Sequence, residues 1–228
     1  MSDALIVRAR LAAPLAGDAP HLDALLEWAM SLHHPRAEPG YKVDRRLAAP
    51  PAGAIPIPLA RRDVAGWPIP LCSSPIVGVN DAEAVEHYAK RIDPDRAGLL
   101  APDARTVMAT TNTWTKSYRL PLRVRLVSEV AWFAVGNRKS ILGLLRRDVH
   151  AIGKKVSIGY GRVREWIVDR VDADLSWFAP TEYGTLLMRP LPAEMELPGD
   201  LIGHRPDFGA CCPPYWHPDR YGEIVTPC

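Results

Sequence analysis

Proline placement limits the folds open to this chain more than any other feature of its sequence. Nine of its 23 prolines, together with four glycines, fall within residues 35–78. Proline fixes φ and removes a backbone hydrogen-bond donor, so a long helix is excluded there. We therefore expect loops and short edge strands over this stretch, with the regular elements on either side of it.

The N-terminal residues predict a strand followed by a helix. Residues 4–11 alternate between apolar and polar positions from Leu5 onward, which is typical of a strand whose polar face carries Arg8 and Arg10. Over residues 21–33 the apolar side chains recur at helical spacing, so an amphipathic helix is expected to pack on that strand. Strand followed by helix is the first half of a βαβ unit.

Further strands are indicated beyond the proline-rich stretch. β-Branched and aromatic residues dominate residues 106–135, and residues 120–127 alternate as a strand with Arg123 and Arg125 on one face. Residues 81–91 are expected to form a short helix that begins at Asp81.

A second helix-to-strand unit completes the pattern. Asn137 is a suitable N-cap for a helix that ends at Gly153, and residues 163–168 then read as a strand. The two halves predict an α+β protein with a ferredoxin-like domain over residues 1–190, interrupted by a loop and hairpin insertion at about residues 35–80. Residues 191–228 are expected to be an irregular C-terminal extension.

Charge is distributed unevenly along the chain. The net charge is only +2, but residues 105–170 hold 14 Lys and Arg against four acidic residues, a balance of +10, and the remainder carries −8. Such asymmetry favours a polyanion as the partner of the middle region. A basic face compensated by salt bridges is the alternative.

Composition narrows the class further. No apolar run approaches the roughly 20 residues that cross a bilayer, and no basic and then apolar leader is present, so we expect no membrane partner and a cytoplasmic protein. The four cysteines are too few and too unevenly spaced for a disulfide scaffold, so reduced thiols are expected. No cofactor is expected.

The most specific local pattern is Gly-Lys-Lys-Val-Ser-Ile-Gly-Tyr-Gly-Arg-Val at residues 153–163, which we call the glycine loop. Its glycines let the backbone bend tightly and bring N–H groups close to a phosphate. Its cations and hydroxyl suit phosphate as well, and Tyr160 offers a ring for an unstacked base. The pattern predicts that single-stranded RNA is bound by these residues: Lys154, Lys155, Ser157, Gly159, Tyr160, Gly161, Arg162 and Arg164.

Two nucleotide-binding loops are excluded, because the run lacks the Gly-Lys-Ser/Thr ending of a P-loop and no Gly-x-Gly-x-x-Gly follows the first strand. A tight turn with solvated lysines remains the alternative.

In its position late in such a domain, the glycine loop resembles that of the RAMP superfamily of CRISPR RNA-binding proteins. The opening strand, Leu22-Asp23-Ala24-Leu25-Leu26 after it, and Pro213-Pro214-Tyr215-Trp216-His217 near the end resemble the small capping subunit, of the fifth Cas protein family, in type IV complexes. The resemblance implies a non-catalytic subunit that binds the 5′ handle of the crRNA and caps a filament of backbone subunits. It also implies a position beside the large subunit, where target DNA enters on the PAM side.

A further group of residues interleaves aromatic rings with charge, as a nucleic-acid surface does. Lys116, Arg119, Arg123 and Arg125 are expected to contact RNA, with Trp114 and Tyr118 between or beside them. Packing of Trp114 in the core is the alternative.

Two histidines bear on whether the chain is an enzyme. His33 and His34 end the first predicted helix, where related guide-processing ribonucleases of the superfamily carry catalytic histidines, and histidine is suited to acid–base cleavage at a 2′-OH. The alternative is that they only stabilise the helix C-terminus. We expect binding without catalysis, with a guide-processing endoribonuclease and a protein-only scaffold as rivals.

The cysteines and histidines near the C-terminal end are candidate zinc ligands. The ligands of such a site would come from Cys211, Cys212, His217 and Cys228, with His204 as a further candidate. Their spacing matches none of the common zinc patterns, so no metal is expected.

Overall fold

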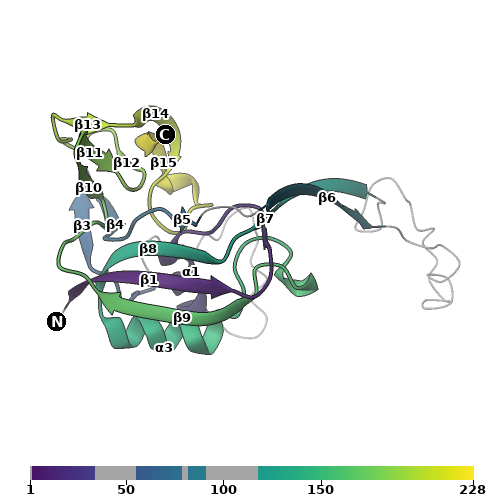
Figure 1. Ribbon diagram of the computed structural model, residues 1–228. Coiled ribbons are helices and arrows are strands. Elements are labelled where there is room, and N and C mark those ends of the chain that lie inside the picture. Colours follow the sequence, from purple (N-terminus) through teal and green to yellow (C-terminus); the bar gives the residue numbers. More distant parts are fainter. Residues whose placement is uncertain (1, 34–54, 79–81, 91–117) are drawn as a thin grey trace, which may run out of the picture.

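The computed structural model describes residues 2–33, 55–78, 82–90 and 118–228 (Figure 1). Within them the chain is mostly β-sheet with two α-helices, in agreement with the predicted α+β class. Neither of these helices has the length and apolar character needed to cross a lipid bilayer.

The main sheet has four strands in the order β5-β8-β1-β9, and every neighbouring pair is antiparallel. Its strands are β1 (Asp3–Leu11), β5 (Ile76–Val77), β8 (Glu129–Gly136) and β9 (Val163–Arg170). The first strand therefore lies in the centre, where Val7 is opposite Trp132 on one side and Val168 on the other. The strands predicted at residues 4–11 and 163–168 are confirmed.

Both helices cover one face of this sheet, α1 (Leu22–Ser31) and α3 (Arg138–Asp148) (Figure 1). Alternate residues of β1 point to that face and are fully buried, and they form the main core with the apolar sides of the two helices. Trp132 and Trp166 meet there, with ring centroids 5.9 Å apart, and each donates its indole N–H to a backbone carbonyl. The helix predicted over residues 21–33 is confirmed.

The cap of α3 is the one that the sequence indicates, since the Asn137 side chain accepts a hydrogen bond from Ser140 N at 3.0 Å. The helix ends at Asp148, however, and not at Gly153. Val149 and Ile152 are still buried, as the helical pattern predicted, because the chain after the helix continues along the same core.

The helix predicted over residues 81–91 is wrong. Within these residues the chain forms strand β6 (Ala82–Lys90), which pairs along its whole length with β7 (Tyr118–Leu126). Alanine, glutamate and lysine favour a helix in isolation, but the backbone hydrogen bonds of the hairpin override that preference. The short strand β2 (Leu15–Ala16) joins the other edge of β7, and the hairpin projects beyond the main sheet (Figure 1).

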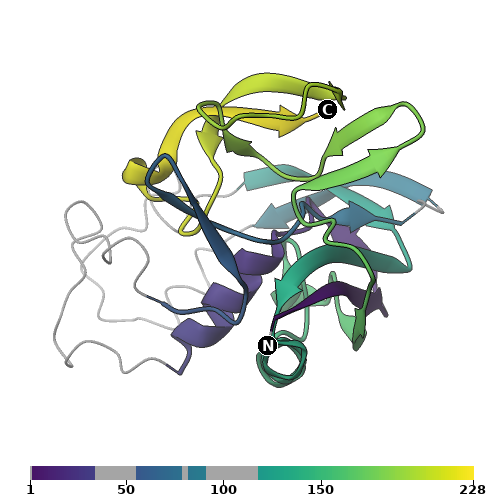
Figure 2. The ribbon, with the colours of Figure 1, turned by 90° about the vertical axis from the view of Figure 1, so that its left-hand side faces the viewer.

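The irregular structure expected after residue 190 is also wrong in part, because that region contains a well-formed hairpin. Strands β14 (His204–Ala210) and β15 (Tyr221–Pro227) pair over seven residues, and η2 (Pro218–Arg220) is a 3₁₀ turn before β15. The remaining short strands are β3 (Arg61–Val64), β4 (Trp67–Pro70), β10 (Phe178–Thr181), β11 (Gly184–Leu187), β12 (Leu191–Pro192) and β13 (Leu201–Ile202). Together with the hairpin they lie at the side of the molecule opposite α3 (Figures 1 and 2).

A second core cluster holds this C-terminal part together. It contains Ile69 from β4 and residues on both sides of position 190, from Trp177 to Ile224. Its proline-rich contribution, β3 and β4, agrees with the short strands expected within residues 35–78.

A buried ion pair connects the two cores. The side chains of Asp23 on α1 and Arg189 after β11 have no solvent exposure, and Arg189 Nη2 lies 3.2 Å from Asp23 Oδ2. The same guanidinium donates to the carbonyl oxygens of Pro70, Cys72 and Cys211. Burial raises the pKa of the Cys72 thiol beside it to about 12, so that thiol is neutral at physiological pH.

We expect Asp23→Ala to lower the free energy of unfolding by about 3–5 kcal/mol, because it leaves the Arg189 guanidinium buried without a counter-charge. Urea unfolding followed by circular dichroism measures this. Arg170→Ala is the control, since Arg170 pairs with Asp3 at the surface with its side chain 72% exposed, and its loss should cost less than about 1 kcal/mol. Equal midpoints for the two variants would contradict the structural role of the buried pair.

Candidate RNA-binding surface

The glycine loop is a narrow reversal between α3 and β9. Ile152 N donates to Gly161 O and Val163 N donates to His150 O, at 2.9 Å each, which brings the two sides of the loop together. A 3₁₀ turn, η1 (Val156–Ile158), forms its tip.

Two backbone hydrogen bonds fasten the loop to the segment around β2. Lys154 N donates to Ala16 O at 2.7 Å, and Gly161 N donates to Pro14 O at 2.8 Å. Within the tip, Ile158 N and Gly159 N donate to loop carbonyls. We expected the loop N–H groups to be phosphate donors, but these four are already used by the fold. These four N–H groups are therefore not available to a phosphate.

Glycine is required at two positions of the loop for reasons that the structure makes specific. Gly161 has φ +62°, and a Cβ there would lie 1.7 Å from Ile152 O. Gly153 has φ +88°, and its Cβ would lie 2.7 Å from Ala16 O. Both are needed so that the loop can pack against its neighbours. Gly159, with φ +103°, has open space around its Cβ position and so leaves the tip accessible.

The β6–β7 hairpin supports the loop from the side. The Lys155 ammonium lies 3.6 Å from the centroid of the Tyr88 ring, a cation–π contact, and the Tyr160 hydroxyl donates a short hydrogen bond to Glu86. That hydrogen bond raises the pKa of Tyr160, so its hydroxyl stays protonated. The Tyr160 ring packs against the small cluster of Ala16, Leu122 and Val124, so part of it is covered.

The cations divide into free and paired groups. Lys154, Arg162 and Arg164 are exposed, and within the described residues none of them forms an ion pair; Ser157 is exposed on the tip beside them. Arg119 on β7 is likewise exposed and forms no ion pair with any described residue. These side chains have the charge and the access that phosphate binding requires.

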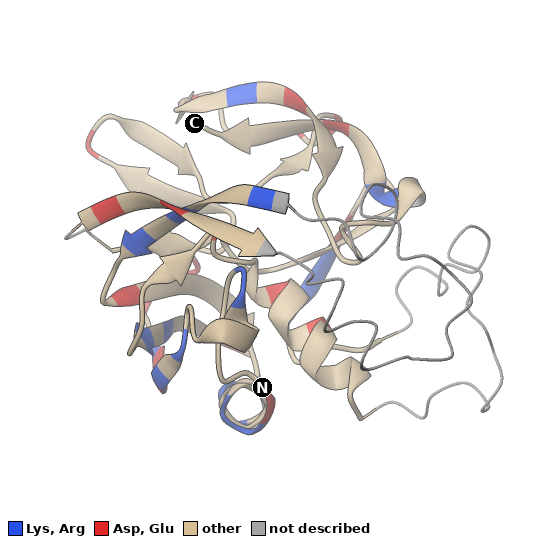
Figure 3. Ribbon diagram, turned by 90° about the vertical axis from the view of Figure 1, so that its right-hand side faces the viewer, with Lys and Arg blue, Asp and Glu red and all other residues tan. Residues whose placement is uncertain are grey.

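The two other arginines of β7 are engaged. Arg123 makes a bidentate pair with Glu83 on β6, with N–O distances of 2.5 and 2.9 Å. Arg125 donates to Gly17 O at 3.1 Å and lies 3.8 Å from Asp18. The sequence pattern missed their partners, and Figure 3 shows the acidic residues of β6 beside the basic residues of β7. RNA contact by Arg123 and Arg125 stays a prediction. Lys116 and Trp114 lie outside the described residues.

The two histidines are placed only in part. His33 Nε2 lies 3.0 Å from Asp148 Oδ2, so the end of α1 is joined to the end of α3, and Arg147 Nε donates to the same carboxylate. His34 lies outside the described residues. In the described ranges, no three or more His, Cys, Asp or Glu side chains are grouped so that they could hold a metal ion. Cys211 and Cys212 are buried thiols, and Cys228 is exposed.

The fold and this surface define an α+β protein that presents a cationic loop beside a projecting hairpin. A family model described as CRISPR type IV associated protein Csf3 matches residues 79–227, which is more than half of the chain and includes the whole glycine loop. The chain belongs to this family, and so is a protein associated with type IV CRISPR systems. A search of curated proteins found no match.

We expect Gly161→Ala to lower the free energy of unfolding by at least about 1–3 kcal/mol, because its Cβ forces a strained left-handed residue against the Ile152 carbonyl. Gly143→Ala is the matched control. Gly143 lies within α3 with open space around its Cβ position, so alanine should be neutral or stabilise by about 0.5–1 kcal/mol. Chemical denaturation of both variants measures the difference, and equal stability would mean that the loop packs differently.

Proposed function

We propose that this chain is a non-catalytic subunit of a type IV CRISPR ribonucleoprotein that binds the 5′ handle of the crRNA and caps the filament of backbone subunits. The observation that carries the proposal is the set of exposed cations without acidic partners at the glycine loop: Lys154, Arg162 and Arg164. Membership of the type IV family supports a CRISPR context for that loop.

The chain order supports the ferredoxin-like reading behind this proposal. The elements of the main sheet and its helices follow each other as β1-α1-β5-β8-α3-β9, which is a β-α-β-β-α-β series. The sheet order β5-β8-β1-β9 places the first and third of these strands in the middle and the second and fourth at the edges. In this arrangement the glycine loop is the connection from the second helix to the last strand, as the RAMP resemblance implies.

Electrostatics favour a single strand of RNA as the ligand of the loop. The cations flank the narrow reversal, Lys154 before its tip, Arg162 at its base and Arg164 on β9, and none of them forms an ion pair with a described acid. The Lys155 ammonium is held over Tyr88 and forms no ion pair in the described residues, so its charge adds to the field of the loop. A tight turn with solvated lysines accounts for the steric need for Gly161, which packing alone requires. What favours RNA binding over that alternative is the set of exposed cations that form no ion pair with the described residues.

The β6–β7 hairpin is the part best suited to contact a neighbouring protein subunit. Among its described side chains, Leu120 and Leu126 share one face by register and are 49% and 46% exposed, while Val85, 60% exposed, lies on the other face. Apolar side chains on a projecting arm favour burial against a partner. We assign this contact to a backbone subunit of the filament. Contacts with the large subunit, and with target DNA on its PAM side, are part of the proposal through the family resemblance.

We expect the double variant Lys154→Ala/Lys155→Ala to bind handle RNA more weakly and with a flatter salt dependence. If each lysine neutralises one phosphate, the slope of log K against log salt should become shallower by about 1.4. Fluorescence anisotropy of a labelled handle RNA across a salt series measures it.

The control for charge alone is Lys139→Ala/Arg170→Ala, which removes two exposed cations outside the loop. Its slope should stay close to that of the original protein. If the loop variant keeps the original slope, the phosphate-binding role of the glycine loop is wrong.

A guide-processing endoribonuclease is the second candidate, and the His33–Asp148 pair is the observation that favours it. An imidazole oriented by a carboxylate is two parts of a general-base arrangement. The same contact also serves as a link between the ends of α1 and α3, and that role needs no substrate.

We expect His33→Ala/His34→Ala to leave crRNA maturation within a few-fold of the original rate. Loss of an essential imidazole in an acid–base ribonuclease costs about 10²-fold to 10⁴-fold. The measurement is the fraction of precursor RNA cleaved over time by the purified chain and by the reconstituted complex. Cleavage at a defined position by the original chain alone, abolished in the double variant, would replace the binding role with the enzymatic one.

A further inference from the structure

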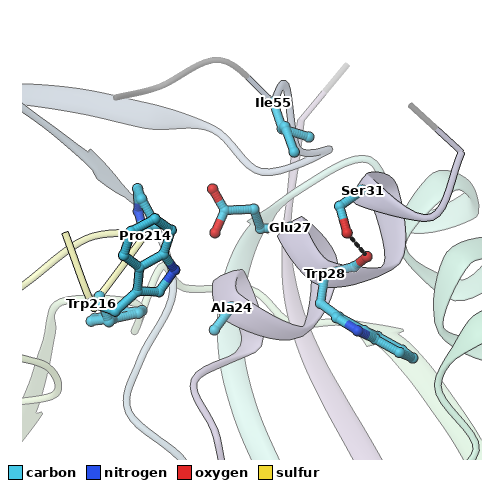
Figure 4. Close-up of a pocket in the computed structure, with 8 residues that line it drawn as sticks. Ala24, Glu27, Trp28, Ser31, Ile55, Pro214 and Trp216 are labelled. Carbon is cyan, nitrogen blue, oxygen red and sulfur yellow. Dashed lines mark hydrogen bonds between the residues drawn. The ribbon is translucent and has the colours of Figure 1, made fainter. Parts of the chain in front are cut away.

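A pocket of about 410 Å³ lies between α1 and the segment that follows β14 (Figure 4). It is separate from the glycine loop and shares no lining residue with it. Its lining residues are Ala24, Glu27, Trp28, Ser31, Ile55, Pro214, Tyr215 and Trp216.

The shape of the pocket suits a flat ligand. Trp216 lies on the side of Ala24 toward which Glu27 points, while the Trp28 indole lies on the other side of Ala24 and is directed away from Trp216 (Figure 4). The small Ala24 side chain lies between the two (Figure 4). The two tryptophans are 50% and 63% exposed, which is unusual for so large an apolar side chain. Exposed indole faces are the surfaces on which unpaired bases stack.

One carboxylate supplies polarity to this apolar pocket. The Glu27 side chain rises from α1 into the pocket (Figure 4), and no described residue donates a hydrogen bond to it. Burial and the negative charge of Asp23 raise the pKa of Glu27, and the positive charges of Arg61 and Arg220 oppose that effect more weakly. The carboxylate is therefore partly desolvated and would gain from N–H donors on a ligand.

A cation stands at the rim. Arg61 on β3 is exposed, and its Nη2 donates to Ile55 O at 3.1 Å, which holds the guanidinium beside the lining residue Ile55. A guanidinium in this position fits a phosphate next to a base that enters the pocket.

We propose that this pocket binds a guanine base of single-stranded RNA, stacked against the Trp216 indole, with its N1–H and N2–H donating to the Glu27 carboxylate. The proposal rests on the proposed function in taking RNA as the partner. It goes further in assigning a second contact site and a base preference.

Hydrogen-bond chemistry selects guanine among the four bases. Its Watson–Crick edge carries two adjacent donors, which match the two oxygens of a carboxylate. Adenine and cytosine have an acceptor beside their amino group, and uracil has acceptors on both sides of its single donor. Each of these bases would therefore place an acceptor next to the negatively charged Glu27 carboxylate, which is unfavourable. An apolar side chain from a protein partner could pack on the indole. It would remove water from the Glu27 carboxylate, however, without donating a hydrogen bond to it.

The test uses the full-length chain and labelled pentaribonucleotides of sequence UUGUU, UUIUU, UUAUU and UUUUU, where I is inosine. Inosine lacks only the N2 amino group, so its loss of one hydrogen bond to a charged acceptor should weaken binding about tenfold. Anisotropy titrations give the four affinities. We expect UUGUU to bind most tightly and inosine to fall between guanine and uracil.

Two variants link this preference to the pocket. Glu27→Gln should abolish the difference between guanine and inosine, and Trp216→Ala should weaken UUGUU at least about fivefold through lost stacking. Tyr183→Ala removes an 80% exposed ring outside the pocket and should change neither result.

The outcomes separate this inference from the proposed function. Equal affinity for all four pentamers, or no binding of any, overturns the guanine pocket, while binding of handle RNA that is lost in the Lys154→Ala/Lys155→Ala variant keeps the handle-binding role. A guanine preference retained in that loop variant supports the pocket as a separate site. If the original protein shows no base preference and Trp216→Ala reduces assembly with the other subunits, the pocket is a protein contact and the inference is wrong.

Discussion

The buried ion pair of Asp23 and Arg189 is the interaction that holds the two core clusters together. The Arg189 guanidinium pairs with Asp23 and donates to the carbonyls of Pro70 and Cys211, so it joins α1, the end of β4 and the chain after β14. The Tyr215 hydroxyl completes the cluster by donating to Asp23, and its ring stacks on His21 with centroids 5.0 Å apart. Because Tyr215 is fixed in this way, its neighbour Trp216 is held at the surface beside α1. The wall of the guanine pocket is thus a consequence of a polar contact in the interior.

The glycine loop depends in a similar way on the hairpin beside it. Glu86 and Tyr88 of β6 hold Tyr160 and Lys155, and Glu83 neutralises Arg123. Ion pairs with acidic residues therefore reduce the positive charge along β7, while the glycine loop keeps its charge. The free positive charge is confined to a smaller region than the +10 charge of residues 105–170 suggests. A positive field concentrated around one loop favours a defined ligand over general attraction to polyanions.

The main sheet and its helices were predictable because the buried residues are apolar and recur every second residue in a strand such as β1 and about every 3.6 residues in a helix such as α1. The strand β6 was not, since residues 82–90 favour a helix by composition and become a strand only through pairing with β7. The loop was found by its glycines, but its acidic and aromatic partners on β6 lie about 70 residues away in the sequence. Trp28 and Trp216 are farther apart still, and no spacing rule connects them. The C-terminal hairpin was missed because proline and glycine there resemble loop signals.

The central place of β1 also sets the order in which the protein can fold. Its partner β9 and the Asp23–Arg189 pair join segments far apart in the chain, the latter separated by 166 residues. At ordinary rates of synthesis the ribosome needs roughly 8–33 s to make that length, during which the first strand has no completed sheet to enter. Long-range closure of this kind slows folding and leaves apolar edges uncovered for longer. The main sheet and the Asp23–Arg189 pair can therefore be completed only when the last third of the chain has been synthesised.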